Sequence, residues 1–149
     1  MEAVLLVGLQ ASGKSTFCKD RLFTSHLRIN LDMLRTRARE RQFMETCLRT
    51  RQPFVVDNTN PTRADRARYI DDAKKSGFRI VGYYFQSNIE DCQRRNERRP
   101  EDERVPTPGI LGTYNRLELP TMDEGFDELY YVKTTADGRF AVEEWKDEV

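Results

Sequence analysis

A short apolar run, AVLLV at residues 3–7, leads directly into the glycine-rich stretch GLQASGKST at residues 8–16. The stretch fits the pattern G-x-x-x-x-G-K-[ST] through Gly8, Gly13, Lys14 and Ser15. A strand pattern precedes it and a helical pattern follows it, so backbone N–H groups and a helix N-terminus can face an anion. An ordinary glycine turn would not explain a lysine at a helix N-terminus, where the helix dipole disfavours a cation. The motif therefore predicts a phosphate-binding loop.

Each part of this loop has an expected role in binding ATP or another nucleoside triphosphate. We expect Lys14 to reach the β and γ oxygens and the Ser15 hydroxyl to bind Mg²⁺. The other residues expected to contact the nucleotide are Gly8, Ala11, Ser12, Gly13 and Thr16. The predicted cofactors are thus a nucleoside triphosphate and Mg²⁺.

Apolar runs alternate with longer amphipathic segments along the whole chain. The predicted strands are AVLLVG, HLRIN, PFVVDN, FRIVGYYF and ELYYVK. This alternation predicts an α/β fold with a five-stranded parallel sheet covered by helices on both faces, in three layers. The length of 149 residues suits a single domain, residues 1–149.

Local signals predict several helix starts and one hairpin. Two residues that precede a proline are expected N-caps, Asn60 and Thr107. Two pairs have capping-box spacing, Ser87 with Glu90 and Thr121 with Glu124. Asp137-Gly138 lies between two β-rich runs and predicts a C-terminal β-hairpin. The proline-rich, highly charged segment 98–109 is expected to be a mobile lid.

Composition limits the class of protein. Hydrophobic residues make up 38% of the chain and charged residues 34%, and no apolar run is long enough to cross a membrane. The three cysteines are far apart in helical patterns, which favours reduced thiols and a cytoplasmic location. Residues 1–117 contain 22 Lys and Arg against 15 Asp and Glu, so this part of the chain is basic. A basic surface can attract a polyanion, although charged helix faces are commonly only solvated.

The stretch INLDMLR, residues 29–35, follows the second predicted strand and offers a carboxylate at the carboxyl edge of the sheet, where open α/β folds bind ligands. Asp32 could accept a proton from an acceptor hydroxyl, and Arg35, three residues later on the same predicted helix face, could steady the acceptor or the phosphoryl group. A helix-start Asp paired with an Arg is an equally good reading of this spacing.

The stretch VVDNTN, residues 55–60, places polar residues at the same edge. We expect Asp57 to help hold the magnesium ion and Thr59 to contact the substrate, whereas Asn60 is expected to cap the next helix.

A second set of candidate residues lies on the helix pattern CQRRNERR, residues 92–99. At 100° per residue, Arg95 and Arg99 flank the apolar face, whereas Arg94 and Arg98 point away from it. We therefore expect Arg95 and Arg99 to close over the nucleotide and stabilise the charge of the transition state.

Six arginines against two glutamates occur between Arg35 and Arg51, next to the predicted acceptor side. Arginines bind phosphates independently of sequence, so this helix suits an acceptor hydroxyl attached to a polyanion.

Taken together, VGLQASGKSTF, INLDMLR, DNTNPTRADRARYI, CQRRNERR and LPTMDEGFDELYYV resemble the 5′-kinase domain of the polynucleotide kinase family, which includes phage, bacterial and animal end-healing enzymes. The resemblance covers about nine-tenths of the chain. It implies an adenylate-kinase-like P-loop NTPase fold and transfer of the γ-phosphate of ATP or another NTP to a 5′-hydroxyl of DNA or RNA. It also implies a general base at Asp32, a substrate-coordinating arginine at Arg35, lid arginines at Arg95 and Arg99, and an acceptor contact at Thr59.

The chain departs from this family in two respects. It contains no D-x-D-x-T phosphatase signature, and the residue before Asp32 is Leu31, where the phage enzyme has a basic residue. Two other readings therefore stay open: a small-molecule kinase of the same fold, similar to zeta-like toxins or chloramphenicol phosphotransferases, and a nucleotide-binding module that switches a partner contact without catalysis.

Overall fold

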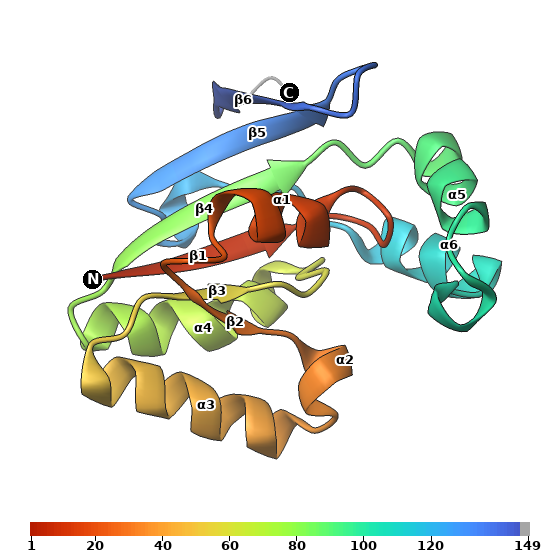
Figure 1. The fold of residues 1–149 in the computed structure, drawn as a ribbon. Helices are drawn as coiled ribbons and strands as arrows, with labels where there is room; N and C mark the ends of the chain where they lie inside the picture. The colour runs from red at the N-terminus through yellow and green to blue at the C-terminus, as the bar shows by residue number, and fades with distance from the viewer. Residues whose placement is uncertain (147–149) are drawn as a thin grey trace.

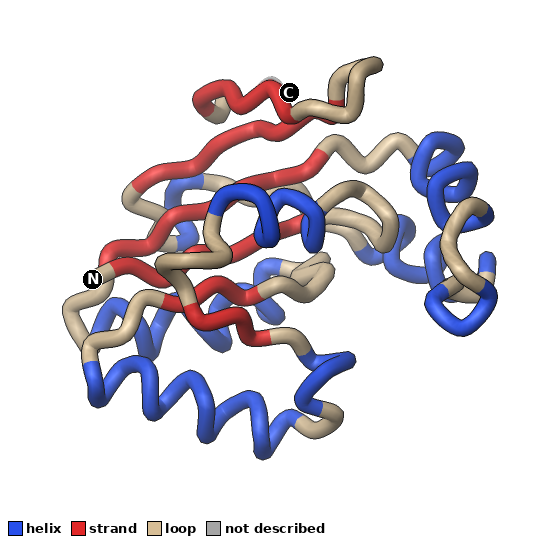
Figure 2. Tube along the Cα trace, viewed as in Figure 1, coloured by secondary structure: helices blue, strands red, loops and turns tan. Residues whose placement is uncertain are grey.

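The computed structural model describes residues 1–146, whose strands form one six-stranded sheet (Figures 1 and 2). The strands are β1 Glu2–Val7, β2 Leu27–Ile29, β3 Phe54–Val56, β4 Arg79–Phe85, β5 Glu128–Thr134 and β6 Phe140–Glu144. Their order in the sheet is β2-β3-β1-β4-β5-β6, with β1 to β5 parallel and β6 antiparallel to β5. The five predicted parallel strands and the C-terminal hairpin are therefore confirmed.

Helices cover both faces of the sheet because the central strands are apolar on both sides. The helices are α1 Lys14–Arg21, α2 Leu31–Leu34, α3 Arg37–Thr50, α4 Arg63–Lys75, α5 Ile89–Glu97 and α6 Thr107–Arg116, with short 3-10 turns η1 Glu101–Glu103 and η2 Met122–Glu124. Along β1, Ala3 and Leu5 join a core that contains Met44 of α3 and Tyr69 of α4. Val4 and Leu6 join the opposite core, with Phe17 of α1. This three-layer arrangement agrees with the sequence prediction.

The pair α5 and α6 stands apart from the layers, beyond the carboxyl end of β4 (Figure 1). The two helices are joined by the segment 98–106, which includes η1. Asn96 holds this segment by both ends of its amide, because Nδ2 donates to the Val105 carbonyl at 2.7 Å and Oδ1 accepts from Val105 N–H at 2.9 Å. The predicted lid segment, residues 98–109, thus includes this connection and the first residues of α6.

Three of the four predicted helix starts are wrong by one or two residues. Thr62 rather than Asn60 caps α4, Asn88 rather than Ser87 caps α5, and Pro106 rather than Thr107 precedes α6. Asn60 has a positive φ of 47°, and its side chain donates to the Leu6 carbonyl of β1 at 2.8 Å instead. The capping box of Thr121 with Glu124 is confirmed, although it starts a 3-10 turn.

The predictions about the cysteines and about membrane-spanning segments can be compared with residues 1–146. The cysteines Cys18, Cys47 and Cys92 are buried, lie in helices and form no disulfide. Within residues 1–146, no helix has the length and apolar character needed to span a bilayer.

Candidate active site

The glycine-rich loop lies between β1 and α1 and has the geometry that its sequence predicts. Gly13 precedes α1 with a φ of 104°, and a Cβ added there would lie 3.1 Å from the ring of Phe140. Both the positive φ and the close approach of the hairpin require glycine at this position. The loop is also bonded to the segment that follows β3, because Gly8 N–H donates to the Thr59 carbonyl at 3.0 Å.

Lys14 is folded against this loop and is only 7% exposed. Its ammonium donates to the carbonyls of Leu9 at 2.6 Å and Gly8 at 2.9 Å. Burial lowers the pKa of Lys14 to about 8, and the nearby Asp57 carboxylate partly opposes that shift. The ammonium therefore lies in the loop where a phosphate would approach, held by acceptors that carry no full charge.

Ser15 and Asp57 lie next to each other, as the metal prediction requires. Ser15 Oγ donates to Asp57 Oδ2 at 2.9 Å, and Arg28 Nε of β2 donates to the same oxygen at 2.8 Å. A hydroxyl beside a buried carboxylate is the oxygen donor set that Mg²⁺ prefers, with the rest of its shell supplied by phosphates and water. Among residues 1–146 there is no cluster of three or more His, Cys, Asp or Glu that could hold a metal alone. These two residues thus fit a magnesium ion that arrives with a nucleotide.

A cleft of about 420 Å³ opens over this loop at the carboxyl edge of the sheet. It is lined by Gln10, Ala11, Lys14, Ser15, Asn30, Leu31, Asp32, Arg37, Asp57, Asn58, Thr59, Asn60, Pro61, Asp65, Arg99, Glu103, Val105 and Arg116. Of the predicted site residues, Ala11, Lys14, Ser15, Asp32, Asp57, Thr59 and Arg99 therefore face one cavity. The phosphate loop and the proposed acceptor carboxylate meet across it.

Asp32 is exposed on α2, a single turn whose start is fixed from two sides. The Asn30 side chain caps the turn by accepting from Met33 N–H at 2.9 Å, and it donates to the Asp57 carbonyl at 2.6 Å. Asn58 Oδ1 accepts from Leu31 N–H at 2.9 Å. The segment after β3 thus sets the position of the turn that carries Asp32.

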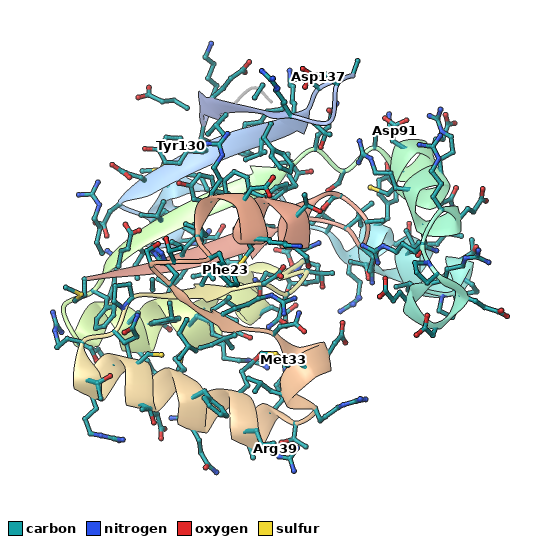
Figure 3. All side chains as sticks on the ribbon, viewed as in Figure 1. Phe23, Met33, Arg39, Asp91, Tyr130 and Asp137 are labelled. Carbon is teal, nitrogen blue, oxygen red and sulfur yellow. The ribbon has the colours of Figure 1, made fainter. Side chains whose placement is uncertain are left out.

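Arg35 does not lie on a helix face shared with Asp32, so that part of the prediction is wrong. The turn α2 ends at Leu34, and Arg35 follows it with a φ of 76°, outside the residues that line the cleft. The next helix, α3, starts afresh at Arg37, capped by Thr36. Arg37 lines the cleft, and sequence reasoning missed it because the break between α2 and α3 changes the helical phase. Figure 3 shows Met33 of α2 and Arg39 of α3 at the same end of the molecule.

The helical angle separated the arginines of α5 correctly. Arg95 and Arg99 are half-buried, whereas Arg94 and Arg98 are exposed. Arg94 forms a surface ion pair with Asp91, which lies on α5 in Figure 3. Arg95 Nη1 donates to the Ala11 carbonyl of the phosphate loop at 3.4 Å, and Arg99 lines the cleft. Arg95 therefore contacts the phosphate loop and Arg99 faces the cleft, and their closing over a nucleotide stays a prediction.

Two further cleft residues, Gln10 and Arg116, were not predicted. Gln10 Nε2 donates to Thr113 Oγ1 of α6 at 3.0 Å, so it joins the phosphate loop to the α5–α6 pair. Arg116 is the last residue of α6. Gln10 lies within the predicted phosphate loop, whereas Arg116 is brought to the cleft by the position of α6, which no local signal in the sequence identifies.

Comparisons with known proteins agree with this geometry. The chain matches the family described as "AAA domain" over residues 4–118. It is 32% identical over 129 residues to the "Bifunctional polynucleotide phosphatase/kinase" of Schizosaccharomyces pombe, covering 84% of this chain and 32% of the relative. The chain thus spans about a third of the length of that curated relative.

Kti12 and a gluconokinase are among the solved structures that share the fold. Kti12 of Chaetomium thermophilum, solved with ADP-AlF3, superposes with a TM-score of 0.64 at 16% identity, over 91% of this chain and 92% of that one. A gluconokinase from Sinorhizobium meliloti superposes with a TM-score of 0.62 at 17% identity, over 89% and 82%.

Proposed function

This chain belongs to the AAA domain family and is a polynucleotide-kinase-like P-loop domain, and from that premise we propose that it transfers the γ-phosphate of ATP or another NTP to the 5′-hydroxyl of DNA or RNA. The observation that carries the proposal is a single cleft lined by both Lys14 of the phosphate loop and the Asp32 carboxylate. The basic residues Arg37, Arg99 and Arg116 line the same cleft and suit a polyanionic acceptor.

On the donor side, the loop N–H groups and the N-terminus of α1 bind the phosphates, and Lys14 supplies positive charge to the β and γ oxygens. Ser15 and Asp57 would hold Mg²⁺, which neutralises phosphate charge when it is bound. Lys14 must then exchange its hydrogen bonds to the Gly8 and Leu9 carbonyls for phosphate oxygens.

On the acceptor side, Asp32 accepts the proton of the attacking hydroxyl while that oxygen forms its bond to the γ-phosphorus and the bond to ADP breaks. Thr59 is proposed to position the acceptor, and Arg95 and Arg99 are proposed to stabilise charge on the migrating phosphoryl group. Segment 98–109 is proposed to act as the lid that excludes water, because it carries the cleft residues Glu103 and Val105 next to Arg99.

A small-molecule kinase is the second candidate, and its supporting observation is the shared fold of the gluconokinase. The two functions differ in the acceptor, because a sugar gains little from a cleft with several arginines. A nucleotide-dependent switch that transfers no phosphate is the third outcome.

One assay separates the three functions. The protein is incubated with γ-labelled ATP, Mg²⁺ and a 5′-hydroxyl oligonucleotide, a 5′-phosphorylated oligonucleotide of the same sequence, or a pool of sugars and metabolites. We expect label only in the 5′-hydroxyl oligonucleotide. Label confined to small molecules would replace the proposal with the second candidate, and the absence of label from every acceptor would favour the switch.

A salt titration provides an independent test of the acceptor class. Oligonucleotide affinity is expected to fall steeply with added salt because bound arginines release counterions from the strand. A flat response would indicate an uncharged acceptor.

A further inference from the structure

Arg37 stands between the active-site cleft and a second cavity. This second cavity, of about 370 Å³, lies between α3 and α4 and is lined by Arg37, Glu40, Arg41, Met44, Arg68 and Tyr69. On α4, Asp65 lines the cleft, and Arg68 and Tyr69, about one turn later, line the second cavity. The two cavities therefore follow one another along the groove between these helices and share the Arg37 side chain.

The Arg37 guanidinium is held from one side by buried partners. Its Nη1 donates to Glu40 Oε1 at 2.9 Å and to Tyr69 Oη at 3.0 Å. Glu40 is 2% exposed and Tyr69 1% exposed, whereas half of the Arg37 side chain is exposed. Its Nε and Nη2 make no hydrogen bond to any residue in the range 1–146. An arginine oriented through one nitrogen, with its other donors free, is preorganised to bind a phosphate.

The same buried carboxylate also controls the turn that carries Asp32. Asn58 Nδ2 donates to Glu40 Oε2 at 2.9 Å, and Asn58 Oδ1 accepts from Leu31 N–H at 2.9 Å. Tyr69 Oη donates to Glu40 Oε1 at 2.8 Å, which completes the donor set of the carboxylate. Glu40 therefore fixes Arg37 and the start of α2 relative to one another, and with them the two ends of the acceptor side.

The second cavity continues the basic character of the cleft. Arg68 is exposed and forms no ion pair within residues 1–146. Arg41 pairs with Glu45 at 2.9 Å and approaches Asp72 at 4.0 Å, so it is partly neutralised. Met44, buried at the floor, adds an apolar surface. Arg68 is thus the cation of this cavity that is most available to a phosphate.

We propose, as an extension of the proposed function, that the acceptor strand runs from Asp32 past Arg37 into the second cavity. Arg37 binds the first phosphate on the 3′ side of the terminal nucleoside, and Arg68 binds a later phosphate of the strand. Glu40 is the positioning residue that orients Arg37 and, through Asn58, the turn with Asp32. The minimal acceptor that uses Arg37 is therefore a nucleoside 3′-phosphate, and only a longer strand uses Arg68.

We call this path of the strand, from Asp32 past Arg37 to Arg68, the acceptor track. It is tested with acceptors of increasing length. Initial rates are measured with a nucleoside, its 3′-phosphate and a 5′-hydroxyl oligomer of several nucleotides, for wild type, Arg37→Ala, Arg68→Ala, Arg35→Ala and Arg39→Ala. Arg37→Ala should raise KM for the 3′-phosphate and the oligomer about 10- to 100-fold, the cost of a lost charged hydrogen bond, with KM for ATP unchanged. Arg68→Ala should raise KM for the oligomer alone. Arg39→Ala, which removes an equal charge from the same helix but lines neither cavity, should change neither.

Glu40→Gln tests the positioning role because it keeps the size of the side chain and removes its charge. It should reproduce the acceptor KM defect of Arg37→Ala, lower kcat through the displaced turn, and leave KM for ATP unchanged. A purely structural role would instead lower thermal stability and change both KM values together. Arg37→Gln serves as a second variant if Arg37→Ala, which leaves Glu40 without one donor, fails to fold.

Other results would overturn the track. If Arg37→Ala and Arg39→Ala behave alike, or if Arg35→Ala alone raises the acceptor KM, the first phosphate does not bind at Arg37. Fluorescence anisotropy with a labelled 5′-hydroxyl oligomer separates this inference from the proposed function. Loss of binding in Arg37→Ala without any phosphoryl transfer by wild type would reject the activity and keep the track, whereas no binding by wild type would reject both.

Discussion

The proposed donor side and the proposed acceptor side of the cleft are built in different ways. The donor groups come mainly from one continuous stretch, residues 8–16, and their key cation, Lys14, is buried against the loop itself. The acceptor groups come from α2, the segment after β3, α3 and α4, and Asp32 is exposed. Lys14 is held by carbonyls of its own loop, whereas the acceptor side depends on a long-range network through Glu40.

This difference indicates which half of a P-loop kinase can change its substrate. A short motif that forms its own binding surface tolerates little change. A surface assembled from several elements can be altered one residue at a time, as the break between α2 and α3 illustrates by bringing Arg37 rather than Arg35 into the cleft.

The largest expected effect is at Arg99, which lies where the two sides meet. Arg99→Ala should lower kcat by about 10³-fold or more, because an arginine that stabilises the charge of phosphoryl transfer is worth that much. Oligonucleotide affinity should change far less, and Arg98→Ala, its exposed neighbour, should be close to wild type. Steady-state rates and anisotropy measure the two quantities. If Arg99→Ala instead weakened oligonucleotide affinity far more than it lowered kcat, Arg99 would be assigned to strand binding. The division between donor and acceptor sides would then not hold at this residue.

Asp32 offers the next largest effect. Asp32→Ala should lower kcat by about 10²- to 10⁴-fold, the usual value of a general base, while calorimetry shows unchanged ATP affinity. Asp65→Ala removes another carboxylate that lines the cleft and should retain most of the activity. Unchanged turnover in Asp32→Ala would exclude it as the base.

The pH dependence of kcat/KM for ATP should report the charge of Lys14 on the donor side. The pKa of this buried lysine is lowered to about 8 in the protein without nucleotide, so its charge is lost as the pH rises through that value. Above about pH 8, kcat/KM for ATP should therefore fall about tenfold per pH unit. At saturating ATP the phosphate charges hold the proton on Lys14, so kcat should stay constant to a higher pH. A common pH limit for both parameters would contradict this assignment.

The smallest effect should be confined to the acceptor side. Thr36 caps α3 by accepting from Arg39 N–H at 3.1 Å, and Arg37 is the first residue of that helix. Thr36→Ala should cost about 1 kcal/mol of unfolding free energy and raise acceptor KM a few-fold, with ATP KM unchanged. Thr46→Ala, which removes a side-chain bond to the Gln42 carbonyl within the same helix, is the matched control. Equal changes in both variants would show that Arg37 does not depend on the cap.

The sequence determined the elements that depend on local chemistry. The glycine-rich loop, the individual strand segments, the hairpin at Asp137-Gly138 and the division of the arginines on α5 all follow from spacing within a few residues. The parallel arrangement follows from the alternation of strand and helix patterns along the chain. The errors in helix starts show the limit of such signals. Asn60 and Thr62 are both residue types that cap helices well. The Asn60 side chain instead donates to the Leu6 carbonyl, 54 residues away, and Thr62 caps α4.

Only the tertiary structure decided the acceptor side. Thr36 is a local cap signal for a helix that starts at Arg37, but the position of α2 also depends on a distant residue, because Asn58 on the segment after β3 accepts from Leu31 N–H. The cavity beyond Arg37 likewise exists only because α3 and α4 pack on the same face of the sheet. Short-range patterns encode backbone conformation within one element, whereas the position of one element against another is a property of the packed core.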